Sequence, residues 1–246
     1  MNVAGIPPRG ASGLPLAIQP DVFLRLLQFT DSGFPTGAFA FSYGLEGLFD
    51  AGLVQSETDV IAFARVQIEE ALAGIELPAA RHAYRFASRG DLDALLALDD
   101  ELTALKPVPA FRAGSARTGR RFLESTAGLV DAPCPSGYRA AVVAGNAAGH
   151  HALAFAVVAQ AAGLDEEMMA LALGGGFLAA LTAAAVRLGI IGQGAAQRAI
   201  AALHPDLLAA VNRARETPID AMGAHLPMID IAGLRQASLP SRLFAS

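Results

Sequence analysis

Apolar residues recur along the chain at the three-to-four-residue spacing of one helix face, and no convincing run alternates apolar and polar residues as a half-buried strand does. In Asp21–Phe29, for example, Val22, Leu26 and Phe29 share one side. The pattern predicts about ten helices and an all-α fold. The expected helices span roughly residues 21–29, 38–52, 56–74, 78–90, 91–105, 110–127, 138–162, 165–188, 193–203 and 205–215.

Local signals fix some helix ends and one loop. Ser56 and Asp59 form a capping box, which predicts a helix that begins after Ser56. The stretch Asp131–Gly137 contains two prolines and a glycine, and it predicts a loop. Gly145 and Gly149 lie four residues apart in a predicted helix, a spacing that lets a neighbouring backbone approach closely.

The spacing of prolines and glycines divides the chain into three parts. Residues 1–19 are rich in Gly, Pro and Ala and predict a flexible leader. Residues 20–216 carry the helical patterns with short connections, which predicts a single helical domain. Residues 217–246 contain three prolines and predict an extended, partner-binding tail.

Composition narrows the possible functions. Hydrophobic residues make up 53% of the chain and charged residues 17%, so a packed core is expected and disorder is not. The net charge of −5 and the lack of a long basic block argue against a nucleic-acid binder. The single cysteine, Cys134, excludes an internal disulfide framework and any multi-cysteine zinc site, and it fits a reducing cytoplasm.

One segment is long and apolar enough to raise the question of a membrane. Met168–Val186 has no charged residue and about the length of a bilayer span of roughly 20 residues. Its apolar character comes mostly from alanine, and Gly174–Gly176 interrupts its middle. Alanine and glycine favour insertion weakly, so the sequence favours a buried core helix. A small membrane-embedded protein is the alternative.

Catalytic motifs are absent from the sequence: it has no Gly-rich phosphate loop, no HExxH, no CxxC and no nucleophile elbow. His150 and His151 form the single histidine pair, and neighbouring helical residues point about 100° apart, so they are poor joint ligands for one ion. No metal or cofactor is therefore expected. A helical metal-dependent enzyme built on these two histidines stays open as an alternative, as does a metal shared across a dimer axis.

A basic stretch follows the middle of the chain. It contains Arg112, Arg117, Arg120 and Arg121 on one predicted helix. Two interpretations stay open: a solvated helix face, or a docking surface for an acidic partner. The apolar composition adds a weaker indication of partner binding, because large exposed apolar patches usually mark interfaces.

Four motifs carry a resemblance to a known family. The first reads LLQFTDSGFPTGAFAFSYGLEGLFDAG over residues 26–52 and closely resembles the N-terminal signature of UreF urease accessory proteins. The positions that fit this signature are Asp31, Ser32, Pro35, Thr36, Gly37, Phe39, Ser42, Gly44, Leu45 and Glu46. We refer to residues 26–52 as motif one.

Three further motifs follow in family order. Motif two is Arg112 and Ser115 followed by Gly119-Arg120, motif three is the turn Ala185–Gln193, and motif four is the terminus Ser241–Ser246. The chain departs from the family pattern at three positions. Ala110 stands where an acidic residue is frequent, and Gln236 and Ala237 stand where the family commonly has His-Glu.

The resemblance implies a cytoplasmic, non-catalytic, homodimeric all-α scaffold. Such a protein bridges the accessory scaffold UreD, also called UreH, and the nickel-carrying GTPase UreG, and the complex docks on apo-urease to deliver nickel. No nucleic acid, membrane or cofactor is implied. The residues expected to bind partners are Asp31, Thr36, Gly37, Phe39, Ser42, Glu46, Arg112, Ser115, Arg120, Arg187, Gly192, Gln193, Arg242, Leu243 and Phe244.

Specific roles are expected for two sets of these residues. The rigid turn from Arg187 to Gln193 is expected to face the GTPase. Arg242, Leu243 and Phe244 are expected to anchor the tail, with the Phe244 ring in a partner's pocket and Arg242 in a charge-assisted contact. The turn at 31–37 has two interpretations, a contact surface or a helix connection in which Pro and Gly are needed by the backbone.

Overall fold

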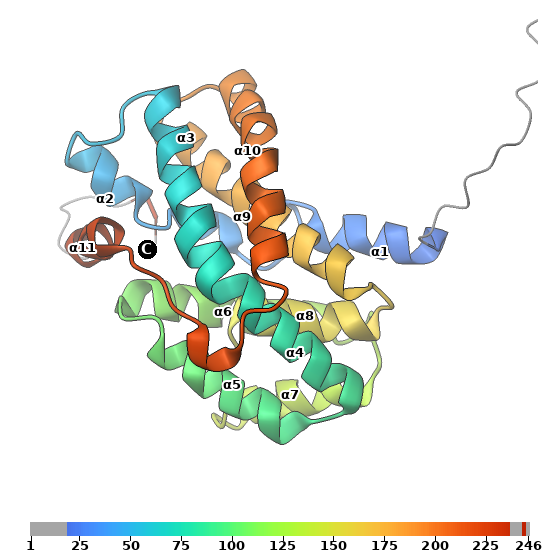
Figure 1. Ribbon diagram of the computed structural model, residues 1–246. Helices are drawn as coiled ribbons and strands as arrows, with labels where there is room; N and C mark the ends of the chain where they lie inside the picture. The colour runs from blue at the N-terminus through green and yellow to red at the C-terminus, as the bar shows by residue number, and fades with distance from the viewer. Residues whose placement is uncertain (1–18, 237–242, 245–246) are drawn as a thin grey trace, which may run out of the picture.

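A computed structural model shows a body of packed α-helices (Figure 1). The structure describes residues 19–236, 243 and 244, apart from the side chain of Phe39. None of these residues belongs to a β-strand, so the predicted all-α fold is confirmed. The leader over residues 1–18, Ala237 and Arg242 lie outside the described residues.

The helices are connected by short turns. In chain order they are α1 (Pro20–Thr30), α2 (Leu45–Asp50), α3 (Glu57–Val66), α4 (Leu77–Arg89), α5 (Leu92–Ala104), α6 (Pro109–Thr126), α7 (Pro133–Val143), α8 (His151–Ala161), α9 (Glu166–Arg187), α10 (Gln193–Arg213) and α11 (Pro227–Gln236). A π-helix, η2 (Gln67–Glu76), joins α3 to α4, and short 3-10 turns lie at η1 (Ala38–Ala40) and η3 (Ile219–Ala221).

The core is built around α8. Eight successive residues, Ala152–Ala159, are buried, because α4, α6, α7 and α9 pack around this helix. A helix that is apolar on every side is stable in water only when other elements surround it. By contrast, α1 extends outward from the helical body (Figure 1) and exposes Phe23, Leu24 and Leu27.

The capping box predicted at Ser56 is confirmed, but the helix that it starts does not end at Gly74. The Asp59 backbone N–H donates to the Ser56 side chain, and the helix then continues through η2 and α4 to Arg89. At Gly74 the chain after α10 comes close, since the Gly223 N–H donates to the Gly74 carbonyl at 3.0 Å. A Cβ on Gly74 would collide with the Gly223 carbonyl, so this glycine permits a close approach rather than a helix end.

The single helix expected over 138–162 is two helices in the structure. α7 begins at Pro133, inside the predicted loop, because proline suits the first turn of a helix. Gly145 and Gly149 have φ of 79° and 78°, and these left-handed residues form the break between α7 and α8. The prediction that they lie within one helix was therefore wrong, but a neighbouring backbone does approach closely at Gly149, where a Cβ on Gly119 would collide with the Gly149 carbonyl oxygen.

Two other helix boundaries also differ from the prediction. α10 passes through Pro205 without a break, because Leu203 and Leu207 on either side are both buried in the core. The helix expected from Ala38 begins only at Leu45. Residues 38–44 instead form η1 and a turn, in which Tyr43 and Gly44 have left-handed backbones that change the direction of the chain.

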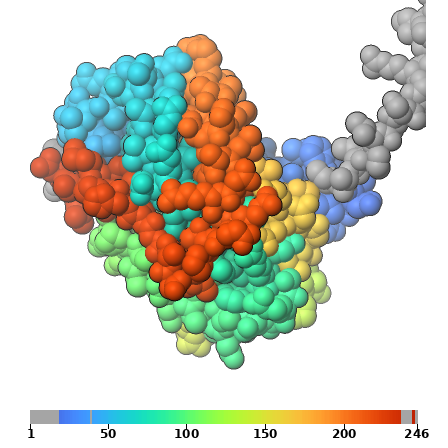
Figure 2. Space-filling view, viewed as in Figure 1, coloured from blue at the N-terminus to red at the C-terminus, as the bar shows by residue number. Residues whose placement is uncertain are grey.

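The predicted extended tail is partly helical. Figure 2 shows the segment after α10 crossing the face of the molecule, with α11 beside α2, as its contacts with α2 and α6 also indicate. Ile229 and Ala232 are buried at this contact. Gly47 allows the close packing, because a Cβ there would lie 2.5 Å from the Ala232 carbonyl oxygen. Apolar burial that the sequence pattern did not reveal therefore holds residues 227–236 in place.

Candidate functional site

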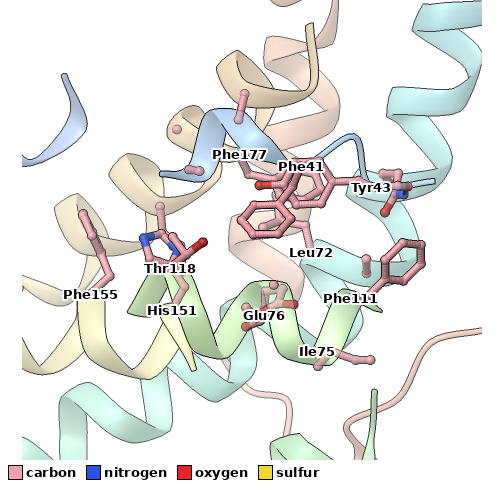
Figure 3. Close-up of a pocket in the computed structure, with 18 of the residues that line it drawn as sticks. Phe41, Tyr43, Leu72, Ile75, Glu76, Phe111, Thr118, His151, Phe155 and Phe177 are labelled. Atoms are coloured by element: carbon pink, nitrogen blue, oxygen red, sulfur yellow. Dashed lines mark hydrogen bonds between the residues drawn. The ribbon is translucent and has the colours of Figure 1, made fainter. Parts of the chain in front are cut away.

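A cavity of about 320 Å³ lies where residues 29–43, η2, α6 and α9 meet, with α11 forming a further wall (Figure 3). This volume is in the range of small-molecule sites in proteins. Aromatic side chains dominate its lining. They are Phe29, Phe34, Phe41, Tyr43, Phe111, Phe155 and Phe177.

Motifs one and two meet at this cavity. Motif one contributes Asp31, Thr36 and Tyr43 to the wall, and the helix that carries motif two contributes Ser115 and Thr118. The two motifs are about 70 residues apart in the chain, and the fold brings them together because α6 packs next to the turn that follows α1. The cavity is therefore the candidate functional site.

Local hydrogen bonds shape the turn of motif one. The Asp31 carboxylate accepts the Gly33 backbone N–H at 2.7 Å, and the Thr36 hydroxyl accepts the Ala38 N–H at 3.3 Å. Gly37 has a φ of 72°, a conformation that favours glycine. These contacts give the backbone interpretation of the turn direct support, while the exposed Asp31 remains open to a partner.

Tyr43 has an unusual backbone conformation and lines the cavity. Its φ of 55° lies in the left-handed region, which is uncommon for a bulky residue and is often found at functional sites. Gln67 holds this conformation, because its Nε2 donates to the Tyr43 carbonyl at 2.8 Å. Burial, and next the negative charge of Glu76, raise the pKa of the Tyr43 hydroxyl well above its usual value. No described residue hydrogen-bonds that hydroxyl.

The π-helix η2 forms one wall of the cavity. It places Leu72, Ile75 and Glu76 along the lining, and Glu76 forms an ion pair with Lys106 in the turn before α6 (Figure 3). π-helical segments are rare and occur often at functional sites, since the extra residue per turn redirects side chains. Here the segment presents an ion pair to an otherwise apolar space.

His151 and Thr118 also face the cavity without a protein partner. Neither ring nitrogen of His151 has a hydrogen bond to a described residue, and burial lowers its pKa to about 4, so the imidazole is neutral at physiological pH. The Thr118 hydroxyl likewise has no partner among the described residues. Other helical threonines donate to the carbonyl four residues earlier, namely Thr30, Thr103, Thr126 and Thr182.

His150, one residue earlier, is fully bonded. Its ring is buried, with Nε2 3.0 Å from the Thr103 hydroxyl and Nδ1 3.1 Å from the Ser115 hydroxyl. Ser115 of motif two, which also lines the cavity, thus holds a core histidine in place. Gly119 of the same motif packs so tightly against Gly149 that a Cβ would collide with its carbonyl.

Asp99, on α5, connects this region to α7 and to the start of α8. We call the contacts around Asp99 the junction of α5, α7 and α8. Its side chain has 0% exposure and accepts the Tyr138 hydroxyl at 2.7 Å. It also accepts the backbone N–H groups of Ala148, Gly149 and His150, the residues that lead into α8. A carboxylate from another helix therefore supplies the N-terminal cap that α8 lacks in its own sequence.

The arginines of α6 have different partners. Arg112 donates to the Lys106 carbonyl at 2.7 Å, and Arg120 donates from Nε to the Ala116 carbonyl at 3.3 Å. The guanidinium of Arg117 lies 4.8 Å from the centre of the Phe41 ring. Arg117 and Arg120 remain exposed, so this helix face can still receive an acidic partner.

Motifs one, three and four meet at a second place. The Glu46 carboxylate accepts the Leu243 backbone N–H at 2.6 Å, and the Arg187 guanidinium stacks 4.3 Å from the Phe244 ring centre. Phe244 is 4% exposed and Leu243 is 64% exposed. The ring expected in a partner's pocket is instead buried in its own chain, and Leu243 is the exposed apolar side chain of the terminus.

The turn of motif three does not line the cavity. Arg187 ends α9, Gly189 has a φ of 75°, and Gly192 and Gln193 begin α10 on the exposed surface. Of the residues expected to bind partners, Gly37, Ser42, Glu46 and Phe244 are buried in the chain. Ser42 accepts the Glu46 N–H at 3.5 Å, which shows a supporting role within motif one.

Sequence reasoning missed several groups at the site. Tyr43 lies inside motif one, and Thr118 lies among the residues of motif two, but no sequence signal separates a threonine that faces a cavity from one that bonds its own helix. Glu76 and Lys106 are 30 residues apart and meet only in the fold. Their pairing depends on the π-helical register, which the periodicity of the sequence did not predict.

The described residues bear on two alternative interpretations of the sequence, a metal site and a membrane-spanning helix. Within this part of the chain, no group of three or more His, Cys, Asp and Glu side chains is placed to hold a metal ion. α9 is the one described helix that is long and apolar enough to cross a membrane, and half of its most apolar window is buried inside the helical body. Burial of this kind is typical of the core helix of a soluble protein.

Comparison with known proteins supports the resemblance carried by the motifs. The sequence profile of the UreF family matches residues 54–204. The chain belongs to the UreF family. It is 31% identical to the urease accessory protein UreF of Trichodesmium erythraeum (strain IMS101), an alignment that covers 91% of this chain and 96% of the relative. The UreF proteins of Arthrobacter sp. (strain FB24) and Methylobacterium radiotolerans are 37% and 34% identical, with the same coverage.

Membership in UreF decides between the remaining classes of protein. The family is named for accessory proteins of urease, so the chain is an accessory protein in urease maturation and not a catalytic enzyme. This displaces the metal-dependent enzyme that His150 and His151 left open. The hydrogen bonds of His150 to Thr103 and Ser115 agree, because both ring nitrogens are already used.

Proposed function

We propose that this chain is a cytoplasmic scaffold that bridges the accessory protein UreD, also called UreH, and the GTPase UreG while nickel is delivered to apo-urease. Membership in the UreF family carries the proposal, because relatives named as urease accessory proteins cover 91% of the chain. Nickel is the cargo of the complex and not a resident cofactor of this chain. The scaffold acts by holding its partners in one arrangement, which is control through differential binding.

The turn of motif three is the proposed surface for the GTPase. Gly192 and Gln193 are exposed at the start of α10, and the adjoining helices α9 and α10 pack on each other, which fixes the turn. A preformed surface loses little conformational entropy on binding. Arg187 borders the same turn and stacks on Phe244, so this surface and the chain terminus are linked.

The chain terminus and α11 are the proposed surface for UreD. Leu243 is exposed, and α11 exposes Met228, Ile231 and Leu234 along one side. These side chains leave an apolar surface next to the docked terminus, and such surfaces usually mark interfaces between proteins. Leu243 replaces Phe244 as the apolar contact in this proposal, because Phe244 is already buried.

We also propose that the scaffold is a homodimer. The exposed Phe23, Leu24 and Leu27 on α1, which extends from the body, support an association of two copies through this helix. The exposed arginines of α6 support a contact with an acidic surface of a partner or of apo-urease. No contact with nucleic acid or with a membrane belongs to the proposal.

Co-expression of the chain with UreD and UreG, followed by size exclusion with light scattering, tests the proposal. One assembly that contains all three proteins, with two copies of this chain, is the expected result. Gln193→Arg should release UreG and leave UreD bound. Gln197→Arg is the matched control, because Gln197 is exposed one turn later on the same helix and lies outside the turn.

Two results would contradict this assignment. A chain that elutes alone in the presence of both partners would refute the scaffold. Loss of UreG from both variants, or from neither, would remove the turn of motif three as the GTPase surface. In that case the scaffold would remain and its contact would have to lie elsewhere.

A further inference from the structure

We propose that the cavity between motifs one and two binds a small, uncharged aromatic molecule that carries a hydroxyl or carbonyl group. Bridging two proteins does not require such a ligand, so this inference goes beyond the scaffold function. Three kinds of observation support it: the shape and lining of the cavity, the polar groups that face it without a partner, and the balance of charge in its wall.

The lining fits an aromatic molecule. The cavity has a volume of about 320 Å³, and its rings come from α1, motif one, α6, α8 and α9. Tyr43 and Phe177 pack with ring centres 4.8 Å apart, and Phe41 and Phe111 lie on the same side of the space in Figure 3. Aromatic side chains attract other rings in offset and edge-to-face arrangements, beyond the effect of the area that they bury.

The polar groups at the cavity can hydrogen-bond a ligand. The Tyr43 hydroxyl, the Thr118 hydroxyl and the His151 ring each face the cavity with no hydrogen bond to a described residue. These polar atoms are reached from the cavity and are not sealed inside the protein, so water can pair with them and a ligand group can replace that water. A ligand hydroxyl or carbonyl can do this, because the hydroxyls and the neutral imidazole both donate and accept.

The charged groups of the cavity wall disfavour an ionic ligand. Glu76 and Lys106 form an ion pair, and their charges cancel within the wall. Asp31 and Asp230 add carboxyl groups at the lining, which disfavours an anionic ligand. A cation would have no unpaired, fully buried carboxylate to receive it in the described wall. An uncharged molecule is therefore the class that fits.

Two adjacent glycines of α9 provide a matched test of position. A Cβ added at Gly176 or at Gly175 meets no atom within 4 Å, so both sites accept a larger side chain. Gly176 lines the cavity, whereas Gly175 does not. Gly176→Leu should fill the cavity, and Gly175→Leu should leave it open. Both changes should favour the helix equally, since glycine is a weak helix former.

The experiment uses 2-naphthol, with naphthalene as the analogue that lacks the hydroxyl. The full chain contains no tryptophan, so the fluorescence of either compound reports its binding directly. We expect saturable binding of 2-naphthol to the wild type. Gly176→Leu should weaken it at least tenfold, and Gly175→Leu should leave its Kd within about twofold.

Variants of the polar groups test the hydrogen bond. Thr118→Val, Tyr43→Phe and His151→Phe each remove a group that has no hydrogen bond to a described residue, so the fold should be kept. At least one should weaken 2-naphthol about tenfold and leave naphthalene unchanged, which is the effect of one lost hydrogen bond. The proposal is overturned if the wild type binds no 2-naphthol, if Gly176→Leu binds it as the wild type does, or if none of the three variants separates the two compounds.

Discussion

His150 and His151 are adjacent in the chain and lie in opposite surroundings. His150 has a hydrogen bond at each ring nitrogen, and its backbone N–H is held by Asp99. His151 packs its ring between Phe122 and Phe155 and has no hydrogen bond to a described residue. Burial lowers the pKa of both to about 4, so the pKa alone does not distinguish them.

The difference separates two regions of the molecule. At the junction of α5, α7 and α8, every polar group that we described has a partner, and the region serves stability. At the cavity, which His151 borders from the start of α8, the Tyr43 hydroxyl, the Thr118 hydroxyl and the His151 ring have no hydrogen bond to a described residue. Local departures of this kind from full hydrogen bonding are expected at functional sites, where stability is lost in return for binding. Substitutions in each of the two regions test this difference between them.

Asp99→Ala should have the largest effect, because it removes the acceptor at the centre of the junction. Three backbone N–H groups and the Tyr138 hydroxyl would lose their partner. We expect the free energy of unfolding to fall by about 4 kcal/mol, since each buried group left unsatisfied costs about 1–3 kcal/mol and some of them regain water. Urea denaturation followed by circular dichroism measures this.

Asp100→Ala is the matched control for this change. Asp100 is exposed on the same helix, and its substitution should alter the free energy of unfolding by less than about 0.5 kcal/mol. Equal effects of the two substitutions would show that Asp99 does not cap α8 and would remove the junction from the comparison.

The pH dependence of stability should follow next in size. A histidine whose pKa is lower in the folded protein takes up its proton first in the unfolded chain. The histidine contribution to stability should therefore fall as the pH drops from about 6.5 toward about 4, and this contribution should level off below that. For the fully buried His150, the loss between pH 7 and pH 5 should be about 2 kcal/mol. Burial is the main cause, followed by the positive charge of Lys106.

His151→Phe sharpens this measurement. The variant removes one titrating ring without removing a hydrogen bond to a described residue, and phenylalanine suits the contacts with Phe122 and Phe155. Urea denaturation at pH 7 and pH 5 should show a smaller decline than in the wild type, with the contribution of His150 still present. Stability that is equal at both pH values in the wild type would contradict the neutral, buried state of both rings.

The sequence predicted the fold class better than it predicted the breaks between helices. Periodicity and the capping box at Ser56 and Asp59 correctly gave an all-α body, because these signals are local. Gly74 and Pro205 resemble helix ends in the sequence, but tertiary contacts keep the chain helical at both. Gly223 packs on Gly74, and the buried Leu203 and Leu207 hold the helix on either side of Pro205.

The candidate site was predictable only in part. Motifs one and two indicated which segments matter, but the cavity depends on contacts that no local pattern encodes. Tyr43 faces it because of a left-handed backbone at φ 55°, and Glu76 faces it because of the π-helix. The burial of Phe244 was not predicted for a similar reason, since its stacking on Arg187 joins residues 57 positions apart.

The smallest contrast compares two hydroxyls on one helix. Ser115 and Thr118 both lie on α6 and line the cavity, but Ser115 is hydrogen-bonded to His150 and Thr118 has no hydrogen bond to a described residue. Ser115→Ala should lower the free energy of unfolding by about 1 kcal/mol, the usual contribution of one hydrogen bond, because Nδ1 of the buried histidine loses its partner. Thr118→Val should change it by less than about 0.5 kcal/mol, since no hydrogen bond to a described residue is lost.

Thermal and urea denaturation of Ser115→Ala and Thr118→Val measure the two changes in the free energy of unfolding. Thr118→Val also exchanges a hydroxyl for a methyl group in an apolar wall, so any small change should be toward greater stability. If Thr118→Val were as destabilising as Ser115→Ala, its hydroxyl would have to be part of the hydrogen bonding that maintains the fold. The cavity would then be a structural void with satisfied walls, and the contrast between the two histidines would carry no functional meaning.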